Sequence, residues 1–257
     1  MKHLPNILTL GNLFCGCIAI ACITSSQPYL IEINTVPYWI TGTEQACLGS
    51  LFIALAAVLD VLDGLTARGL KLFSSIGKDL DSLADLVSFG VAPSMILFKM
   101  LWAANIAKPN AMDVSMLAMA PAFLVACFGA LRLARFNVSV STGATFTGMP
   151  IPAAGILIAS FPLINLYTPQ FGMYFKNPWL LYLVIALVSW LMVSKITFFK
   201  LMPSKWDMKS LWPRIILIGA CAVLFPFLKF AAIPALFVLY IILSLVYRPQ
   251  KHLAQTL

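Results

Sequence analysis

The chain consists of long apolar runs that alternate with short polar stretches. Each run has about the 20 mostly apolar residues that an α-helix needs to cross the hydrocarbon core of a membrane. The expected spanning helices occupy residues 4–24, 46–67, 78–101, 113–136, 149–168, 178–197, 213–228 and 230–247. We therefore predict an all-α fold, a polytopic transmembrane helical bundle of about eight helices. The last two runs are separated only by Lys229 and its neighbours, so a tight or re-entrant hairpin is the alternative for them.

Composition agrees with this pattern and excludes a soluble globular class. Hydrophobic residues make up 61% of the chain and charged residues 10%, with a mean hydropathy of +0.94. The polar stretches are too short to form a separate domain, so we predict one integral-membrane domain over residues 1–257.

The distribution of basic residues predicts the orientation, because lysine and arginine concentrate in cytoplasmic loops. With the N-terminus inside, 13 of the 17 basic residues fall on the cytoplasmic side: Lys2, Arg68, Lys71, Lys78, Arg132, Arg135, Lys195, Lys200, Lys205, Lys209, Arg214, Arg248 and Lys251. The other four are Lys99, Lys108, Lys176 and Lys229. The net charge of +8 thus faces anionic lipid, and no nucleic-acid partner is needed to explain it.

Acidic residues are concentrated around the second polar stretch, at the cytoplasmic ends of the second and third helices. Five of the nine in the chain are found there: Asp60, Asp63, Asp79, Asp81 and Asp85. Residues three or four apart share a helix face, so Asp60 points with Asp63 and Asp81 points with Asp85. Because residues 68–76 alone separate the two groups, neighbouring antiparallel helices should bring these four carboxylates into one pocket.

Four carboxylates at a membrane boundary repel one another and lose solvation. Oxygen ligands of this kind select hard cations such as Mg²⁺, Mn²⁺ or Ca²⁺. The small residues Gly64 and Ala67 leave room for a flat ligand to approach the backbone. The alternative is that the acids cap helices or form ion pairs with Arg68, Lys71 and Lys78.

The spacing DxxDGxxARx8GxxxDxxxD resembles the signature of the CDP-alcohol phosphatidyltransferases. Its fixed positions are Asp60, Asp63, Gly64, Ala67, Arg68, Gly77, Asp81 and Asp85. The resemblance implies an enzyme that uses Mg²⁺ or Mn²⁺, with two ions, to move a phosphatidyl group from CDP-diacylglycerol to an alcohol and release CMP. It assigns metal binding to Asp60, Asp63, Asp81 and Asp85. Asp85 is also the expected general base and catalytic residue.

Four further segments resemble the phosphatidylserine synthase branch of that family, which implies L-serine as the acceptor. They are "PNILTLGNLFCG", "VSFGVAPS", "RLARFN" and "FTGMPIPAAG". This resemblance places a catalytic core at about residues 4–160 and leaves C-terminal helices at about 178–247. The residues assigned to CDP-diacylglycerol are Asn6, Thr9, Gly64, Ala67, Arg68 and Gly77. For Asn6, Thr9 and the nearby Asn12, capping of the first helix is the alternative.

Arg132 and Arg135 are candidates to hold the serine carboxylate or the donor phosphates, because a guanidinium binds such groups with two parallel hydrogen bonds. They are equally explained as topological anchors at a helix end. The expected setting is a bacterial or archaeal cytoplasmic membrane with the active site facing the cytoplasm. The expected partners are CDP-diacylglycerol, L-serine and membrane lipids, and a homodimer is allowed.

Three rival functions stay open at this point. Glycerol phosphate or inositol phosphate could replace serine as the acceptor. A membrane prenyltransferase also uses aspartate clusters, but it would have a third aspartate where this chain has Ala67. A cation transporter would place intramembrane carboxylates on broken helices near the bilayer midplane.

Overall fold

A computed structural model describes residues 4–25, 28–33, 36–42, 44–70, 75–106, 114–138, 145–199 and 208–246. The long helices are α1 (Leu4–Ser25), α2 (Glu44–Gly69), α3 (Ser75–Asp85), α4 (Ala92–Ile106), α5 (Leu124–Val138), α6 (Ile151–Tyr167), α8 (Pro178–Val193), α9 (Met208–Leu228) and α10 (Ala232–Val246). The short helices are η1 (Leu86–Val91), η3 (Met116–Ala118), η4 (Ala120–Phe123), α7 (Pro169–Gly172), η5 (Met173–Lys176) and η6 (Lys229–Ala231).

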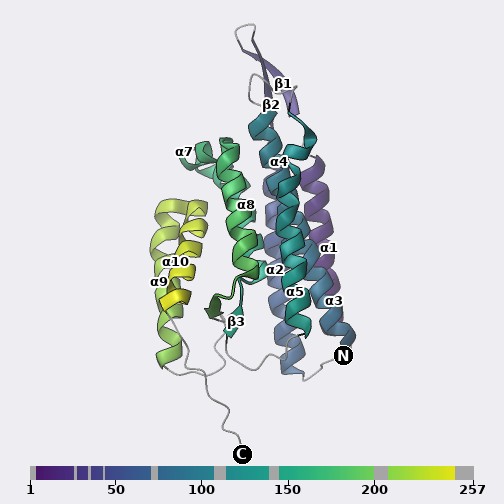
Figure 1. Cartoon of the computed structure of the whole chain (residues 1–257), viewed down its shortest axis with the longest axis vertical. Helices are drawn as coiled ribbons and strands as arrows, with labels where there is room; N and C mark the ends of the chain where they lie inside the picture. The colour runs from purple at the N-terminus through teal and green to yellow at the C-terminus, as the bar shows by residue number, and fades with distance from the viewer. Residues whose placement is uncertain are drawn as a thin grey trace, which may run out of the picture.

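The long helices stand roughly side by side in one bundle (Figure 1). α1 begins, α2 ends, α3 begins and α5 ends at the lower end of Figure 1, which we call the site end. Arg68, Arg135, Lys195 and Arg214 belong to segments at this end. Lys2, Lys71, Lys108, Lys200, Lys205, Arg248 and Lys251 lie outside the described residues.

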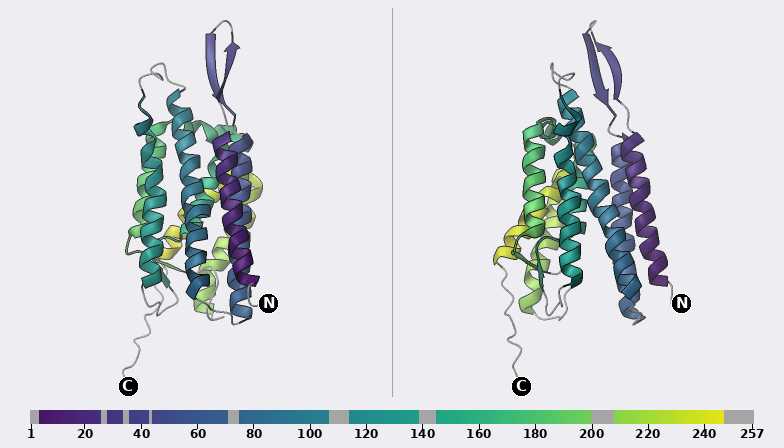
Figure 2. Two further views of the ribbon diagram at one scale, coloured as in Figure 1. Left: turned by 90° about the vertical axis from the view of Figure 1, so that its right-hand side faces the viewer. Right: turned by 45° about the vertical axis from the view of Figure 1, so that its right-hand side comes forward.

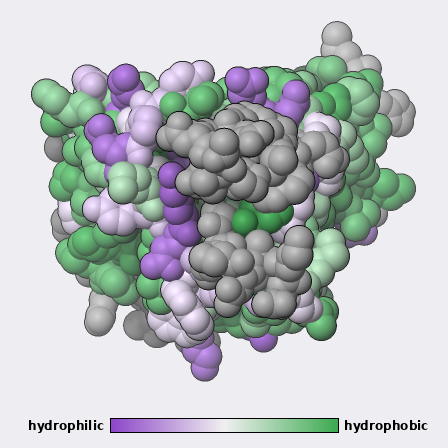
Figure 3. Space-filling model, turned by 90° about the horizontal axis from the view of Figure 1, so that it is seen from above, coloured by the Kyte–Doolittle hydropathy of each residue, from purple (hydrophilic) through white to green (hydrophobic). Residues whose placement is uncertain are grey.

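The predicted all-α membrane bundle is confirmed, with two small additions that the sequence pattern did not predict. β1 (Pro28–Ile33) and β2 (Val36–Thr41) form an antiparallel hairpin beyond the upper end of the bundle (Figure 2). β3 (Thr145–Thr147) pairs antiparallel with β4 (Thr197–Phe199) at the site end. Seen from the end that carries the β1–β2 hairpin, apolar residues cover much of the flanks (Figure 3).

The predicted number of eight spans is not confirmed. In the described residues, five helical segments are long and apolar enough to cross a membrane, or six if the bent pair α6 and α7–η5 counts as one span. α8 has 16 residues rather than the 20 expected over 178–197, because the chain leaves the helix at Ser194 and enters β4. The pair bends by 119° between Tyr167 and Pro169, where proline cannot continue the helical hydrogen bonds.

The last two apolar runs form the hairpin that the sequence left as an alternative. α9 and α10 lie side by side at the edge of the bundle and are joined by η6 (Figures 1 and 2). Lys229 makes the turn with a left-handed φ of 49°. The Tyr240 hydroxyl of α10 donates to the Phe199 carbonyl oxygen at 3.0 Å, so the hairpin is attached to β4.

Close approach of α1 to its neighbours depends on glycine. A Cβ atom on Gly49 of α2 would lie 2.6 Å from Ile23 Cγ1 and 3.0 Å from the Ala19 carbonyl oxygen. A Cβ atom on Gly16 of α1 would lie 2.9 Å from the Cα atom of Ser88. α1 therefore packs tightly against both α2 and η1, which brings its polar residues next to the aspartates.

Candidate active site

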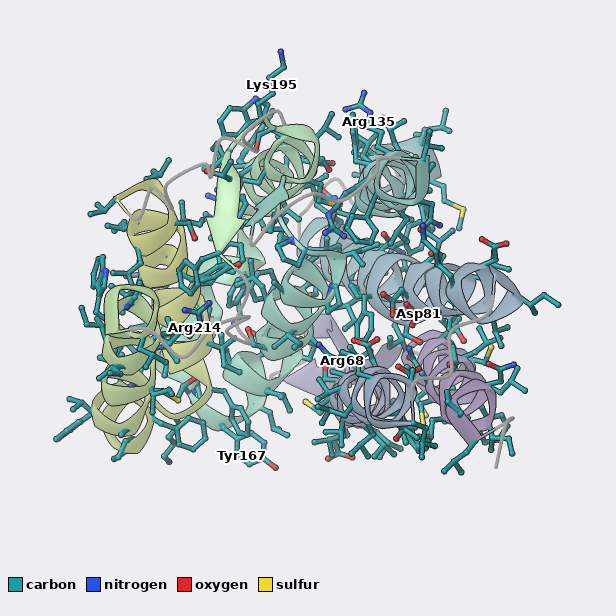
Figure 4. The ribbon with its side chains drawn as sticks, turned by 90° about the horizontal axis from the view of Figure 1, so that it is seen from below. Arg68, Asp81, Arg135, Tyr167, Lys195 and Arg214 are labelled. Atoms are coloured by element: carbon teal, nitrogen blue, oxygen red, sulfur yellow. The ribbon has the colours of Figure 1, made fainter. Side chains whose placement is uncertain are left out.

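Three aspartates meet at the site end of the bundle, from two different helices. Oxygen atoms of Asp60, Asp63 and Asp81 all lie within 4.8 Å of one another. Asp60 and Asp63 come from α2, and Asp81 comes from α3 (Figure 4). The predicted convergence of carboxylates from two helices is therefore confirmed for these three.

Asp85 borders this group without being one of the three. It is the last residue of α3, one turn beyond Asp81, and its side chain is 8% exposed. Its carboxylate interacts electrostatically with Asp60, Asp81 and Asp63. All four acids of the signature thus share one electrostatic environment.

The carboxylates lie deeper in the bundle than the predicted helix ends. α2 continues from Asp60 to Gly69, which at 1.5 Å per residue places Asp60 about 13 Å from the end of the helix. Asp63 and Asp81 also lie inside their helices, so the capping alternative is wrong for these three. The Lys78 ammonium donates to the Asn137 carbonyl oxygen at 3.0 Å. The Arg68 guanidinium donates to the Gly64 carbonyl oxygen at 2.9 Å. Lys71 lies outside the described residues.

The two helices that carry the acids are held by α1 rather than by each other. α1 packs along both α2 and α3, whereas α2 and α3 make few close backbone contacts. The prediction that α2 and α3 are directly adjacent is therefore wrong. Their backbones are separated, both pack on α1, and their carboxylates meet in the space between them. This separation leaves room for the carboxylates.

Neutral donors from α1 orient two of the four carboxylates. The Thr9 hydroxyl lies 2.8 Å from Asp63 Oδ2, with the Pro5 carbonyl oxygen at 3.0 Å as its other acceptor. The Asn12 amide Nδ2 donates to Asp85 Oδ1 at 3.3 Å. Thr9 and Asn12 lie well inside α1, so the capping interpretation of these two residues is wrong.

A π-helix begins directly after Asp85. η1 covers Leu86–Val91, and the Ser88 hydroxyl donates to the Asn12 carbonyl oxygen at 3.0 Å. Single π-helical turns within α-helices occur frequently at functional sites. Here the wider turn connects α3 to α4 and keeps Ser88 against α1.

The arrangement fits a hard divalent cation. The three converging ligand groups are all carboxylates, and Asp81 Oδ1 is buried without a hydrogen-bond partner in the described part of the chain. Such a donor set favours Mg²⁺ or Mn²⁺ over metals that prefer nitrogen or sulfur. An unpaired buried carboxylate oxygen beside two further acids is otherwise costly, so the chemistry of these residues agrees with a metal site.

The remaining residues predicted to bind the donor belong to the site-end parts of α1, α2 and α3. Gly64 has open space on one side: among the described residues, an added Cβ atom would meet only the Arg68 guanidinium, at 3.7 Å. Ala67 and Gly77 are half-buried, and so is Asn6 in the first turns of α1. The structure therefore brings the donor candidates to the same end as the acids.

The two predicted arginines differ in their surroundings. Arg132 of α5 is 9% exposed, interacts electrostatically with Asp85, and has a buried Nε atom without a hydrogen-bond partner among the described residues. Arg135 is exposed, and its side chain points away from the bundle (Figure 4). Both line a pocket of about 240 Å³ that also has Phe136, Met192, Val193, Ser194 and Lys195 in its wall. The structure brings Arg132, and not Arg135, to the carboxylates.

The segment "GMPIP" (residues 148–152) connects the start of α6 to the end of α8. Gly148 adopts a φ of 79°, a left-handed conformation that favours glycine. Its N–H donates to the Ile196 carbonyl oxygen at 2.9 Å, and the N–H of Met149 donates to the Leu191 carbonyl oxygen at 3.0 Å. The segment thus ties the start of α6 to the end of α8, next to the arginine pocket.

Several supporting residues could not be assigned from the sequence. The Asn137 amide donates to Ser82 at 2.8 Å and so connects α5 to α3. Ser88 and Tyr240 also act through contacts between elements far apart in the chain. The one usable signal is on α1, where Thr9, Asn12 and Gly16 follow each other at helical spacing on the buried face.

The chain belongs to the CDP-alcohol phosphatidyltransferase family, whose model matches residues 2–194. It is 35% identical over 200 residues to a CDP-diacylglycerol–serine O-phosphatidyltransferase of Bacillus subtilis, covering 77% of this chain and 90% of the relative. It is 32% identical over 208 residues to the enzyme of that name from Helicobacter pylori strain J99, with 80% and 75% covered. An archaetidylserine synthase of Methanothermobacter thermautotrophicus is 34% identical over 150 residues, with 58% and 56% covered.

Metal binding by the three converging acids can be measured without turnover. We expect the purified chain to bind Mn²⁺, and Asp81→Asn to weaken that binding by about tenfold or more because one anionic ligand is lost. Free Mn²⁺ would be followed by electron paramagnetic resonance. Asp79→Asn is the matched control, since Asp79 is exposed on the same helix and should leave the affinity unchanged. Equal weakening by both variants would show that general negative charge, rather than this cluster, attracts the ion.

Proposed function

We propose that this chain transfers the phosphatidyl group of CDP-diacylglycerol to the hydroxyl of L-serine, giving phosphatidylserine and CMP. The observation that carries the proposal is the convergence of three of the four signature aspartates, Asp60, Asp63 and Asp81, within 4.8 Å in a member of the CDP-alcohol phosphatidyltransferase family. Two of the relatives described above are named as serine O-phosphatidyltransferases. The acceptor assignment draws on those names and on the serine-type segments of the sequence.

The donor binds where α1, α2 and α3 meet. Gly64 and Ala67 leave room for a flat nucleotide, and Asn6, Arg68 and Gly77 are further donor-binding residues in this proposal. Thr9 acts indirectly, because its hydroxyl is directed to Asp63. The acyl chains stay in the lipid while the diphosphate reaches the carboxylates.

Asp60, Asp63 and Asp81 would hold Mg²⁺ or Mn²⁺, with Asp85 as a further ligand and two ions in the complete site. When bound, the metal supplies positive charge that neutralises the diphosphate and the departing CMP. Thr9 orients Asp63 for this task through a neutral hydroxyl that does not compete for the positive charge.

Asp85 is the general base. It takes the proton from the serine hydroxyl, and the serine oxygen forms a bond to the phosphorus that carries diacylglycerol. The bond from that phosphorus to the bridging oxygen breaks, and CMP leaves with the bridging oxygen. Burial of Asp85 excludes water that would otherwise attack the same phosphorus.

Arg132 holds the carboxylate of serine. It is close enough to Asp85 to interact with it electrostatically, and its Nε–H lacks a partner that a carboxylate oxygen would supply. Arg135 is on the outer side of the same pocket, where it attracts anionic substrates. The donor diphosphate is the alternative ligand for both arginines.

The site faces the cytoplasm of a bacterial or archaeal cell in this proposal. The positively charged loops of the site end favour the cytoplasmic side, and serine is a water-soluble cytoplasmic metabolite. The catalytic core covers about residues 4–160, and the C-terminal helices at about 178–247 support it from the side. Surrounding membrane lipids contact the apolar flanks, and a homodimer is compatible with this arrangement.

Another acceptor with the same chemistry is the nearest rival. A cation transporter is disfavoured by two observations besides the family. α2 is a continuous helix through Asp60 and Asp63, and the strongly bent pair α6 and α7–η5 bends at the opposite end of the bundle. The carboxylates are therefore not placed on the broken helices that transporters use.

The function is tested by incubating the purified chain in detergent with CDP-diacylglycerol, Mn²⁺ and a panel of alcohols. We expect CMP release with L-serine, and much less with glycerol 3-phosphate or inositol 1-phosphate. EDTA should abolish the release and added Mn²⁺ should restore it. Faster release with another alcohol would reassign the acceptor, and full activity in metal-free buffer would contradict the proposed chemistry.

The role of Arg132 predicts a specific kinetic change. Arg132→Ala should raise KM for serine by about tenfold or more, because a buried charged hydrogen bond to the carboxylate is lost, while KM for CDP-diacylglycerol changes little. Arg135→Ala should have a smaller effect, because its side chain points outward. Lys176→Ala removes a positive charge from the opposite end and is the control. A rise confined to KM for the lipid would place the arginine on the donor.

A further inference from the structure

Asn12 is a buried polar residue whose side chain has one hydrogen-bond partner among the described residues. Its side chain is 0% exposed, and its Nδ2 donates to Asp85 Oδ1 at 3.3 Å. The Oδ1 atom of the same amide is buried and has no hydrogen-bond partner within the ranges that the structure describes. The contact with Asp85 is therefore what orients this amide.

The amide can face Asp85 in only one way. A carboxylate accepts hydrogen bonds and repels a second acceptor, so the NH₂ group of Asn12 turns toward Asp85 and the carbonyl oxygen turns away. A neutral donor also brings no positive charge into the group of acids. Lysine or arginine at this position would instead neutralise Asp85 and compete with a cation for it.

The backbone around this contact is held on both sides. The Asn12 carbonyl oxygen accepts from the Ser88 hydroxyl at 3.0 Å, three residues beyond Asp85. Gly16, one turn further along α1, allows the Ser88 backbone to approach. Asn12 and Asp85 thus belong to two segments whose separation is fixed by a second hydrogen bond and by close packing.

We infer that Asn12 is a positioning residue for the proposed phosphatidyl transfer, and this inference rests on that proposed function. Its amide occupies one carboxylate oxygen of Asp85, Oδ1, and so leaves Oδ2 directed to the serine hydroxyl. The Ser88 hydrogen bond and the π-helix fix the position of Asn12 relative to Asp85. Asn12 touches neither substrate nor metal in this scheme and acts only through Asp85.

A double-mutant cycle tests this role, with kcat and KM measured for CMP release by the full chain. Asn12→Ala should lower kcat by about tenfold and leave KM for CDP-diacylglycerol within about twofold, because the base is disordered while the donor site is kept. Asp85→Asn should lower kcat by about 10²-fold or more. Adding Asn12→Ala to Asp85→Asn should lower kcat no further, since two residues that act as a unit are not additive.

Two more variants separate positioning from folding. Asn12→Leu keeps the branched shape of the side chain without a donor, and it should reproduce the fall in kcat at an unchanged thermal unfolding midpoint. Asn105→Ala is the control: Asn105 is also buried and its amide donates within α4, to the Leu101 carbonyl oxygen at 2.9 Å. It should leave kcat unchanged.

Each contrary outcome has a distinct meaning. The inference fails if Asn12→Leu keeps the kcat of the unmodified chain, or if Asn12→Ala lowers kcat by the same factor with and without Asp85→Asn. In either case the proposed function stands, because the unmodified chain still releases CMP with serine. Absence of CMP release by the unmodified chain would overturn the proposed function and this inference together.

Discussion

Repulsion between the carboxylates of Asp60, Asp63, Asp81 and Asp85 is the constraint around which this bundle is organised. Asp60 is about 13 Å from the end of a membrane helix, and α2 and α3 together present all four acids to one another. Loss of hydration makes such a group unfavourable by several kcal/mol per ion unless positive charge enters. α1 supplies neutral hydrogen-bond donors to Asp63 and Asp85, and the buried Arg132 of α5 interacts electrostatically with Asp85. Asp60, Asp63 and Asp81 are the three acids for which we propose a bound cation.

The position of the site between lipid and water follows from the same arrangement. In the proposed function, the headgroup of the lipid donor reaches the carboxylates while its acyl chains stay in the lipid. The proposed acceptor is water-soluble and would enter from the site end, to which the segments of Arg68, Arg135, Lys195 and Arg214 belong. Arg132, which is buried and interacts electrostatically with Asp85, belongs to α5 and not to the three helices that carry the donor candidates. In the proposed function, the two substrates therefore approach Asp85 from different helices.

Local spacing in the sequence was sufficient to predict the bundle and the convergence of the acids. Asp60 and Asp63 share a helix face, and so do Asp81 and Asp85, whatever the rest of the chain does. Local spacing could not predict features that depend on contacts between segments far apart in the chain. The Asn12–Asp85 contact joins residues 73 positions apart in the chain, and Ser88 of the π-helix donates to the Asn12 carbonyl oxygen across 76 positions. The outward direction of Arg135 and the early end of α8 at Val193 depend on how α5 and α8 pack and on the β3–β4 pair.

The central claim is that the serine oxygen attacks the phosphorus attached to diacylglycerol at this group of acids. L-Serine labelled with ¹⁸O in its hydroxyl tests it directly, with the purified chain, CDP-diacylglycerol and Mn²⁺, and with both products analysed by mass spectrometry. The account predicts that phosphatidylserine carries the label and that CMP does not. Labelled CMP-serine together with phosphatidate would place the attack on the other phosphorus, and unlabelled phosphatidylserine would show that the serine hydroxyl is not the nucleophile.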